Sequence, residues 1–175
     1  LGMRFRFLDP ASNSPANLLA DHLAFDYAEK FALEQFARGL DVITYEFENV
    51  PVDAARYLEK FVPVYPSPIA LEKAQDRFVE KSFFCELDIP TPKFTTDMNT
   101  AVGFPAVLKT RRMGYDGKGQ TIINLATELK DQNSNEMILE EFVSFDRELS
   151  IIAVRSKSGE TRFYPLVENQ HRDGI

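Results

Sequence analysis

Residues 106–120 read AVLKTRRMGYDGKGQ, and this stretch carries more information about the fold than any other part of the chain. Its first residues belong to an apolar segment, residues 105–110, that is typical of a buried β-strand. Lys109 lies in that segment, so its alkyl stem can pack against apolar neighbours while its ammonium group emerges from the strand at a fixed point. A lysine in such a strand is costly unless its charge meets an anion. We therefore expect an anionic ligand beside Lys109, with phosphate as the first choice.

The loop after this strand is rich in glycine and in basic residues, namely Gly114, Gly117 and Gly119 with Arg111, Arg112 and Lys118. Glycines let backbone N–H groups close around an anion without interference from Cβ atoms. The loop runs from strand to strand and lacks a Gly-Lys-Ser/Thr ending, so it is neither a Walker A motif nor a GxGxxG turn that opens a helix. The alternative interpretation is an ordinary hairpin with a solvated basic tip.

The elements predicted around this hairpin form two groups. In the first group, strands at residues 3–8, 41–45 and 62–65 alternate with helices at 28–38 and 51–61, which implies a parallel sheet with right-handed crossovers. A proline-marked break at residues 66–68 precedes a helical stretch at 69–87, predicted in two pieces. The second group consists of short strands at residues 119–124, 137–143, 148–154 and 161–168. We expect an α/β domain followed by an α+β domain, with the boundary between residues 66 and 92.

Composition narrows the class of protein. The formal net charge is -7 and the pI is near 4.9, which disfavours a nucleic-acid partner because phosphate backbones are bound by clustered Lys and Arg. No apolar stretch approaches the roughly 20 residues of a membrane span, and no signal-peptide pattern opens the chain. The single cysteine, Cys85, is expected to be a small buried residue rather than half of a disulfide. A cytoplasmic protein fits these features best.

A second informative segment is MILEEFVSFDRE, residues 137–148. Glu140 and Glu141 end an apolar strand and lead into Phe142 and Val143, which together offer backbone polar groups and apolar cover to an adenine ring. Glu148 is an acceptor-only carboxylate that suits ribose hydroxyls. The alternative is that these acids are solvated charges at the edge of a sheet.

Three further residues have mainly structural interpretations. Arg77 is expected to pair with Glu80 along one face of a helix. His22 lies in a stretch expected to be helical. His171 is structural by default, but it belongs to a dense polar run, residues 168–174, that follows an apolar strand and favours a site at the strand end.

Five segments together resemble the PurK family of N5-carboxyaminoimidazole ribonucleotide synthetases, in the order in which that family has them. They are TYEFENVP (44–51), AQDRFVEK (74–81), LKTRRMGYDGKGQ (108–120), ILEEFVSFDRELS (138–150) and FYPLVENQHRDGI (163–175). The sequence motifs GYDGKGQ and YEFENV are specific to this branch of the ATP-grasp superfamily. The resemblance implies a Rossmann-like pre-ATP-grasp domain over residues 1–68, without its first strand, and an incomplete ATP-grasp domain over residues 69–175.

The resemblance also implies a role for each matching residue. Arg77 and Lys109 would contact the phosphates of ATP, Glu148 would bind the ribose, and His171 would lie near the nucleotide. The adenine hinge would be Glu140, Glu141, Phe142 and Val143. The loop that covers the phosphates would be Gly114, Tyr115, Asp116, Gly117, Lys118, Gly119 and Gln120. Within it, Tyr115 and Asp116 would face bicarbonate and the aminoimidazole, and they are the expected catalytic residues.

The implied reaction is the ATP-dependent carboxylation of 5-aminoimidazole ribonucleotide (AIR) in purine biosynthesis. Bicarbonate would be phosphorylated to carboxyphosphate, and its carboxyl group would pass to the exocyclic amine, leaving ADP and phosphate. The resemblance implies a cytoplasmic homodimer that uses ATP and Mg²⁺ and binds neither nucleic acid nor membrane. The Mg²⁺ ligands are expected beyond residue 175, with none inside the chain.

The sequence departs from the family pattern in three places. The first strand and its glycine-rich turn are missing before Leu1, the stretch at residues 96–104 is shorter than the family's, and the chain stops at Ile175 before the second half of the ATP-grasp lobe. Three interpretations therefore stay open. They are this ligase or a fragment of it, another ATP-grasp ligase such as a formate-dependent glycinamide ribonucleotide transformylase or a biotin carboxylase, and a non-catalytic nucleotide-binding module.

Overall fold

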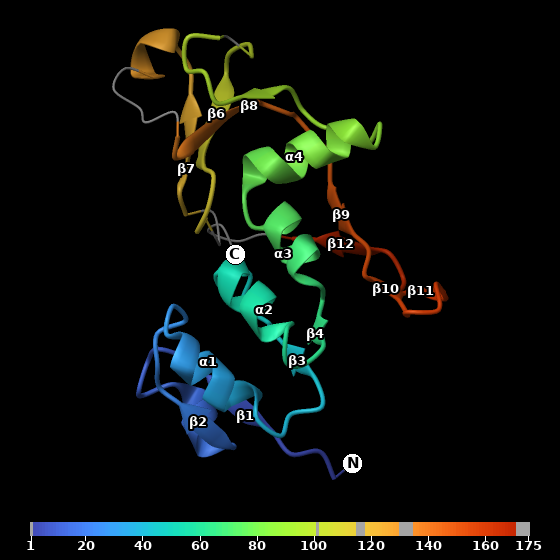
Figure 1. Ribbon diagram of the computed structural model, residues 1–175. Coiled ribbons are helices and arrows are strands. Elements are labelled where there is room, and N and C mark those ends of the chain that lie inside the picture. The colour runs from blue at the N-terminus through green and yellow to red at the C-terminus, as the bar shows by residue number, and fades with distance from the viewer. Residues whose placement is uncertain (1, 101, 115–117, 130–134, 171–175) are drawn as a thin grey trace. The chain divides into compact units, whose positions relative to one another are not determined.

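The computed structural model describes residues 2–100, 102–114, 118–129 and 135–170 of the chain (Figure 1). Contacts divide the chain into two compact units, Leu1–Ile89 and Pro90–Ile175. Within the described residues, no helix has both the length and the apolar character of a membrane span.

The first unit alternates short strands with helices, as the sequence predicts. Its elements are β1 (Arg6–Leu8), η1 (Pro15–Leu18), β2 (Asp21–Leu23), α1 (Lys30–Ala37), β3 (Ile43–Thr44), α2 (Val52–Leu58), β4 (Val64–Tyr65), α3 (Pro68–Ala74) and α4 (Arg77–Glu86). The strands pair in parallel, but as two separate pairs, β1 with β2 and β3 with β4, where a single sheet was expected. The prediction that His22 is helical was wrong: it lies in β2, whose three residues are too few for a period-2 pattern to show.

One apolar core holds the first unit together. Leu33 and Phe36 of α1 pack with Leu58 of α2 and Val64 of β4, and all four are buried. These apolar residues recur at helical spacing in α1, which is why the sequence predicted that helix within a residue or two of its observed ends.

The helical stretch after the proline break consists of two helices, α3 and α4, as the sequence predicted. Asp76 separates α3 from α4 and caps α4, because its carboxylate accepts hydrogen bonds from the backbone N–H groups of Phe78 at 3.0 Å and Val79 at 3.4 Å. Cys85 was expected to be buried, and this was wrong: it is exposed on α4, a helix with no fully buried residue. Both helices belong to the first unit by their contacts. The domain boundary expected after residue 68 stays a prediction.

The second unit is built on an antiparallel sheet in the order β5-β8-β6-β7. Two of the predicted strands are each split, into β9 and β10 and into β11 and β12; β9 pairs with β12, and β10 with β11. The elements of this unit are β5 (Phe94–Thr95), β6 (Ala106–Thr110), β7 (Gln120–Ile123), η2 (Ala126–Leu129), β8 (Met137–Glu141), β9 (Glu148–Ser150), β10 (Ala153–Arg155), β11 (Thr161–Phe163) and β12 (Val167–Asn169).

The core of the second unit lies on one face of this sheet. Ala106 and Leu108 of β6, Ile123 of β7 and Leu139 of β8 are buried together there. Successive side chains of a strand point to opposite faces. The alternate residues of β6, including Lys109, therefore lie on the other face.

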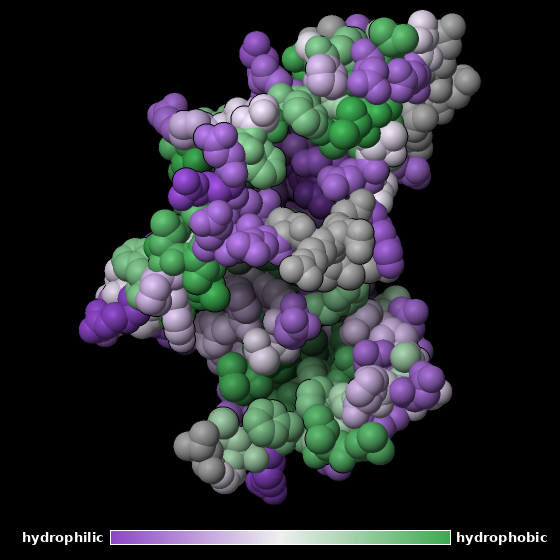
Figure 2. Space-filling model, turned by 180° about the vertical axis from the view of Figure 1, so that it is seen from behind, coloured by the Kyte–Doolittle hydropathy of each residue, from purple (hydrophilic) through white to green (hydrophobic). Residues whose placement is uncertain are grey.

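Large apolar side chains also remain at the surface. Green, hydrophobic surface lies at the bottom of Figure 2. The exposed apolar residues of the first unit include Phe5, Leu18, Leu19 and Phe31. Contiguous apolar surface of this kind is typical of a face that other protein covers.

Candidate functional site

Strand β6 places Lys109 on the face of the sheet opposite the second unit's core. Its register neighbours are Gln120 on β7 and Ile138 on β8. Because β6 has a partner on each side, its backbone is held by two ladders, and the starting point of the lysine side chain is fixed. The predicted strand and the placement of Lys109 in it are both confirmed.

The ammonium group of Lys109 already has an anionic partner. Its Nζ lies 2.9 Å from Oε2 of Glu140, and the two side chains are 23% and 5% exposed. Glu140 faces Val107 in the register, so it lies on the same face as Lys109 and one step diagonally across from it. Lys109 thus has an anionic partner inside the protein, a carboxylate, and its expected contact with phosphate stays a prediction.

The glycine loop connects β6 to β7 as a hairpin, and the structure describes its two ends. Arg111 is tied to the start of β8, because its backbone N–H donates to Glu136 O at 2.8 Å and its Nη1 donates to Asn135 O at 3.2 Å. At the other end, Gly119 O accepts from the N–H of Thr110 at 2.8 Å. Three residues named as loop or catalytic residues, Tyr115, Asp116 and Gly117, lie outside the described residues.

Gly119 occupies a position that no other residue would fill without strain. Its φ is +72°, and a Cβ placed on it would lie 2.6 Å from Oγ1 of Thr110. The Thr110 hydroxyl is itself buried and has no hydrogen-bond partner among the described residues. Gly119 therefore packs tightly against Thr110 at the end of β6, next to Lys109.

The end of β8 carries the four residues predicted to form an adenine hinge, a role that stays a prediction. Glu141 is the last ladder residue: its N–H donates to Lys93 O at 2.8 Å, and its Oε2 lies 3.4 Å from the N–H of Lys93. Phe142 and Val143 have left the ladder and are 42% and 46% exposed. A contact of Phe142 and Val143 with an adenine ring stays a prediction, and the side chain of Glu140 points toward Lys109.

Glu148 stands in a different part of the second unit, on β9. It faces Asn169 of β12 in the register, and Asn169 Nδ2 donates to Glu148 Oε1 at 2.8 Å and to Ser150 Oγ at 2.7 Å. Asn169 was missed as an individual residue, although it belongs to the polar run that the sequence marked out. His171 follows two residues later and lies outside the described residues.

Arg77 is placed at the start of α4, one residue after the capping Asp76, and so belongs to the first unit. Its pairing with Glu80 stays a prediction. Among the described residues, no group of three or more His, Cys, Asp or Glu side chains is arranged to hold a metal ion.

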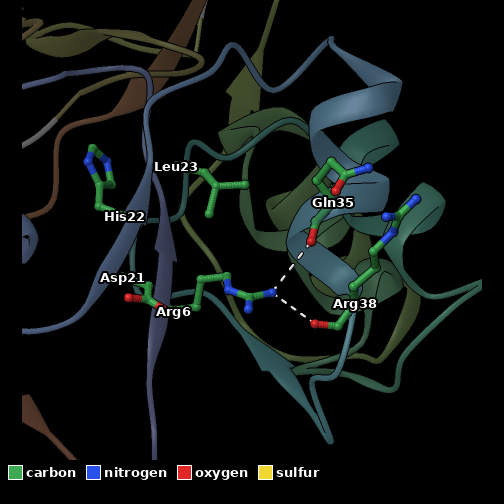
Figure 3. Close-up of a pocket in the computed structure, with 6 residues that line it drawn as sticks. All are labelled: Arg6, Asp21, His22, Leu23, Gln35 and Arg38. Carbon is green, nitrogen blue, oxygen red and sulfur yellow. Dashed lines mark hydrogen bonds between the residues drawn. The ribbon is translucent and has the colours of Figure 1, made fainter.

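The first unit has an open pocket of about 490 Å³ that sequence reasoning did not anticipate, lined by Arg6, Asp21, His22, Leu23, Gln35 and Arg38 (Figure 3). Arg6 Nη1 donates to the backbone oxygens of Phe36 at 3.2 Å and Arg38 at 2.8 Å. The guanidinium thus neutralises the negative end of α1, and the imidazole of His22 points away from it. Arg6 thus satisfies backbone carbonyl groups at the C-terminal end of α1.

Comparisons with known proteins agree with this geometry. Residues 74–175 match the model of the ATP-grasp domain, and residues 1–75 match that of the ribonucleotide synthetase preATP-grasp domain. An N5-carboxyaminoimidazole ribonucleotide synthase of Pseudomonas aeruginosa is 46% identical over 187 aligned positions, which cover 100% of this chain and 52% of that protein. The alignment is longer than the chain, so the relative has residues without a counterpart here.

Solved structures give the same result. The N5-carboxyaminoimidazole ribonucleotide synthetase of Thermus thermophilus matches with a TM-score of 0.88 at 47% identity, over 99% of this chain and 50% of that one. An N5-carboxyaminoimidazole synthase of Aspergillus clavatus, in complex with ADP and AIR, matches with a TM-score of 0.75 at 26% identity, over 96% of this chain and 47% of that one.

The chain thus spans about half the length of the relatives that it matches. The predicted order of a pre-ATP-grasp domain followed by part of an ATP-grasp domain is confirmed, and so is the resemblance to N5-carboxyaminoimidazole ribonucleotide synthases. The chain belongs to the ATP-grasp family.

Proposed function

We propose that the protein containing this chain carboxylates AIR with bicarbonate and ATP to give N5-carboxyaminoimidazole ribonucleotide, ADP and phosphate. The observation that carries the proposal is Lys109, a partly buried lysine at the end of a central strand, directly before a glycine loop. The names of the similar proteins, and the ADP and AIR bound by the Aspergillus relative, support the choice of reaction within the ATP-grasp family.

Phosphoryl transfer asks a protein mainly to position its reactants and to neutralise charge. Lys109 would face the phosphates of ATP, and the loop from Gly114 to Gln120, with Lys118, would close over them and exclude water from carboxyphosphate. Phe142 and Val143, beyond the end of β8, would hold the adenine. Glu148, already oriented by Asn169, would accept hydrogen bonds from the ribose.

The remaining parts of the proposal rest on the family. Arg77 would reach a phosphate and His171 would lie near the nucleotide, while Tyr115 and Asp116 would face bicarbonate and the amine. Mg²⁺ would offset the charge of ATP when bound. A cytoplasmic homodimer is part of the same proposal.

Product analysis tests the reaction. The full-length protein should release ADP only when bicarbonate and AIR are both present, and it should form the carboxylated product. ADP release that depends on formate and glycinamide ribonucleotide, or on biotin, would instead assign another ATP-grasp activity. Nucleotide binding without any ADP release would assign a binding module.

Exchange of the strand lysine tests the site. Lys109→Met should weaken ADP binding by about 10- to 100-fold, the value of a charge-assisted hydrogen bond to phosphate. Lys157→Met, in the turn between β10 and β11, makes the same change in charge and should leave the affinity unchanged. Equal affinities for Lys109→Met and the unmodified protein, measured by titration calorimetry, would remove Lys109 from the site.

A further inference from the structure

Gln75 is a buried polar residue whose side chain holds a loop outside the core. It is 7% exposed and is the C-cap of α3, where its backbone N–H donates to Leu71 O. Its Nε2 donates to the backbone oxygens of Glu48 at 2.8 Å and of Val50 at 2.6 Å. Both N–H groups of the amide are thus bound to one distant segment. Because a buried amide is costly unless it is bonded, we infer that this residue serves the conformation of that segment.

The segment held by Gln75 is the loop at residues 45–50, which follows the carboxyl end of β3. A further hydrogen bond fixes the start of this loop, because the Tyr45 hydroxyl donates to Ser67 O at 3.2 Å. Ser67 is the N-cap of α3, so the loop is attached to both ends of one helix. Between these attachments three side chains are exposed, those of Glu46, Phe47 and Glu48.

This loop occupies the place of a substrate-binding loop in an α/β fold. Strands β3 and β4 are parallel and in register, so the loops that follow them begin at the same edge of the pair. In open α/β sheets, ligands bind outside the carboxyl ends of the strands. The proposed function assigns most contacts with ATP to the second unit and requires a further site for AIR. The loop at residues 45–50 fits the second requirement by its position and by its fixed backbone.

We propose that Gln75 is a positioning residue for AIR, which holds the loop at residues 45–50 in the conformation that contacts the ribonucleotide. This inference rests on the proposed function. The amide acts through the backbone of the loop and does not itself touch AIR. Two carbonyl oxygens face Nε2, so the position needs a side chain with two donors. A methionine of similar length has no N–H group to offer them.

A purely structural role and a positioning role predict different kinetics. If Gln75 only stabilises the first unit, its replacement lowers the fraction of folded protein, so kcat falls and the KM values stay unchanged. If Gln75 positions the loop, the folded protein must order the loop when AIR binds, and the KM for AIR rises. Arg77 lies two residues further along and is assigned to a phosphate of ATP. A general displacement of this junction would therefore also weaken ADP binding.

The experiment uses the full-length protein, with AIR varied at saturating ATP and bicarbonate, and measures ADP affinity by titration calorimetry. Gln75→Met should raise the KM for AIR by roughly tenfold, the effect expected for two lost hydrogen bonds. The value of kcat and the Kd for ADP should stay unchanged. Gln35→Met is the matched control: it removes an amide from a half-buried position on α1 in the same unit and should leave all three quantities unchanged.

The outcomes separate this inference from the proposed function. An unmodified protein that forms no carboxylated product from AIR would overturn both. If the unmodified protein is active, but Gln75→Met leaves the KM for AIR unchanged or weakens ADP binding to the same degree, the positioning role is wrong and the proposed function stands.

Should Gln75→Met fail to fold, Tyr45→Phe decides. It removes the hydroxyl that attaches the start of the loop to Ser67 O and keeps the aromatic ring. The KM for AIR should then rise by about threefold, the effect of one lost hydrogen bond, with the Kd for ADP unchanged. An unchanged KM for AIR in Tyr45→Phe would overturn the proposal.

Discussion

Replacement of Gly119 by alanine tests the hairpin that positions Lys109. Two independent costs follow from the structure. A residue with a Cβ pays about 1–2 kcal/mol to adopt the left-handed backbone conformation, and Gly119 has a φ of +72°. In addition, the new methyl group would lie 2.6 Å from Oγ1 and 3.3 Å from Cγ2 of Thr110. Relief of such a contact in a packed region costs about 1–3 kcal/mol, so the total is about 2–5 kcal/mol.

Gly159 offers a matched control in the same unit. Its φ is +88°, but a Cβ on it would have no heavy atom within 4 Å. Gly159→Ala should therefore lower stability only through the backbone conformation, by about 1–2 kcal/mol. The difference between the two variants isolates the steric contact with Thr110.

Hydrogen exchange measured by NMR is the right assay, because it reports stability locally in a chain with two compact units. The amide of Thr110 donates to Gly119 O at 2.8 Å and reports directly on the closed hairpin. Its protection should fall strongly in Gly119→Ala and far less in Gly159→Ala. Equal loss of protection in the two variants would refute the close packing of Gly119 against Thr110.

Two further predictions concern single side chains. Arg6→Met removes the guanidinium that caps α1 and should lower the stability of that helix end by about 1–2 kcal/mol. The loss should appear as faster amide exchange in the last turn of α1. Unchanged exchange would show that the cap is not needed. Asp97→Ala should destabilise the turn after β5. The carboxylate of Asp97 accepts hydrogen bonds from the backbone and side chain of Asn99 and from the Thr100 hydroxyl. These bonds lower the pKa of the Asp97 carboxyl group from its ordinary value of 3.8. A carboxyl group with a lowered pKa stabilises the fold at pH values above 3.8, and this stabilisation is lost as the pH falls through the folded-state pKa. The denaturation curves of Asp97→Ala and the unmodified protein should therefore differ most near neutral pH and converge in acid. A difference that is the same at every pH would contradict this account.

Elements with a strong local signal were predictable from the sequence. The helix around Leu33 and Phe36 and the strand around Leu108 show the periodicity of their secondary structure, and both were found within a few residues of their expected ends. The short strand β2 was not predictable, because three residues carry no period. The pairing of strands into separate pairs was also out of reach, since pairing depends on partners far away in the chain.

The site shows the same limit at the level of side chains. Residue type and local context marked Lys109 as a lysine that needs an anion, and that physical argument was correct. The identity of its partner was not available, because Glu140 is 31 residues away and becomes a neighbour only through the register of β6 with β8. A local pattern can thus state what a charge requires, whereas the tertiary structure decides which group supplies it.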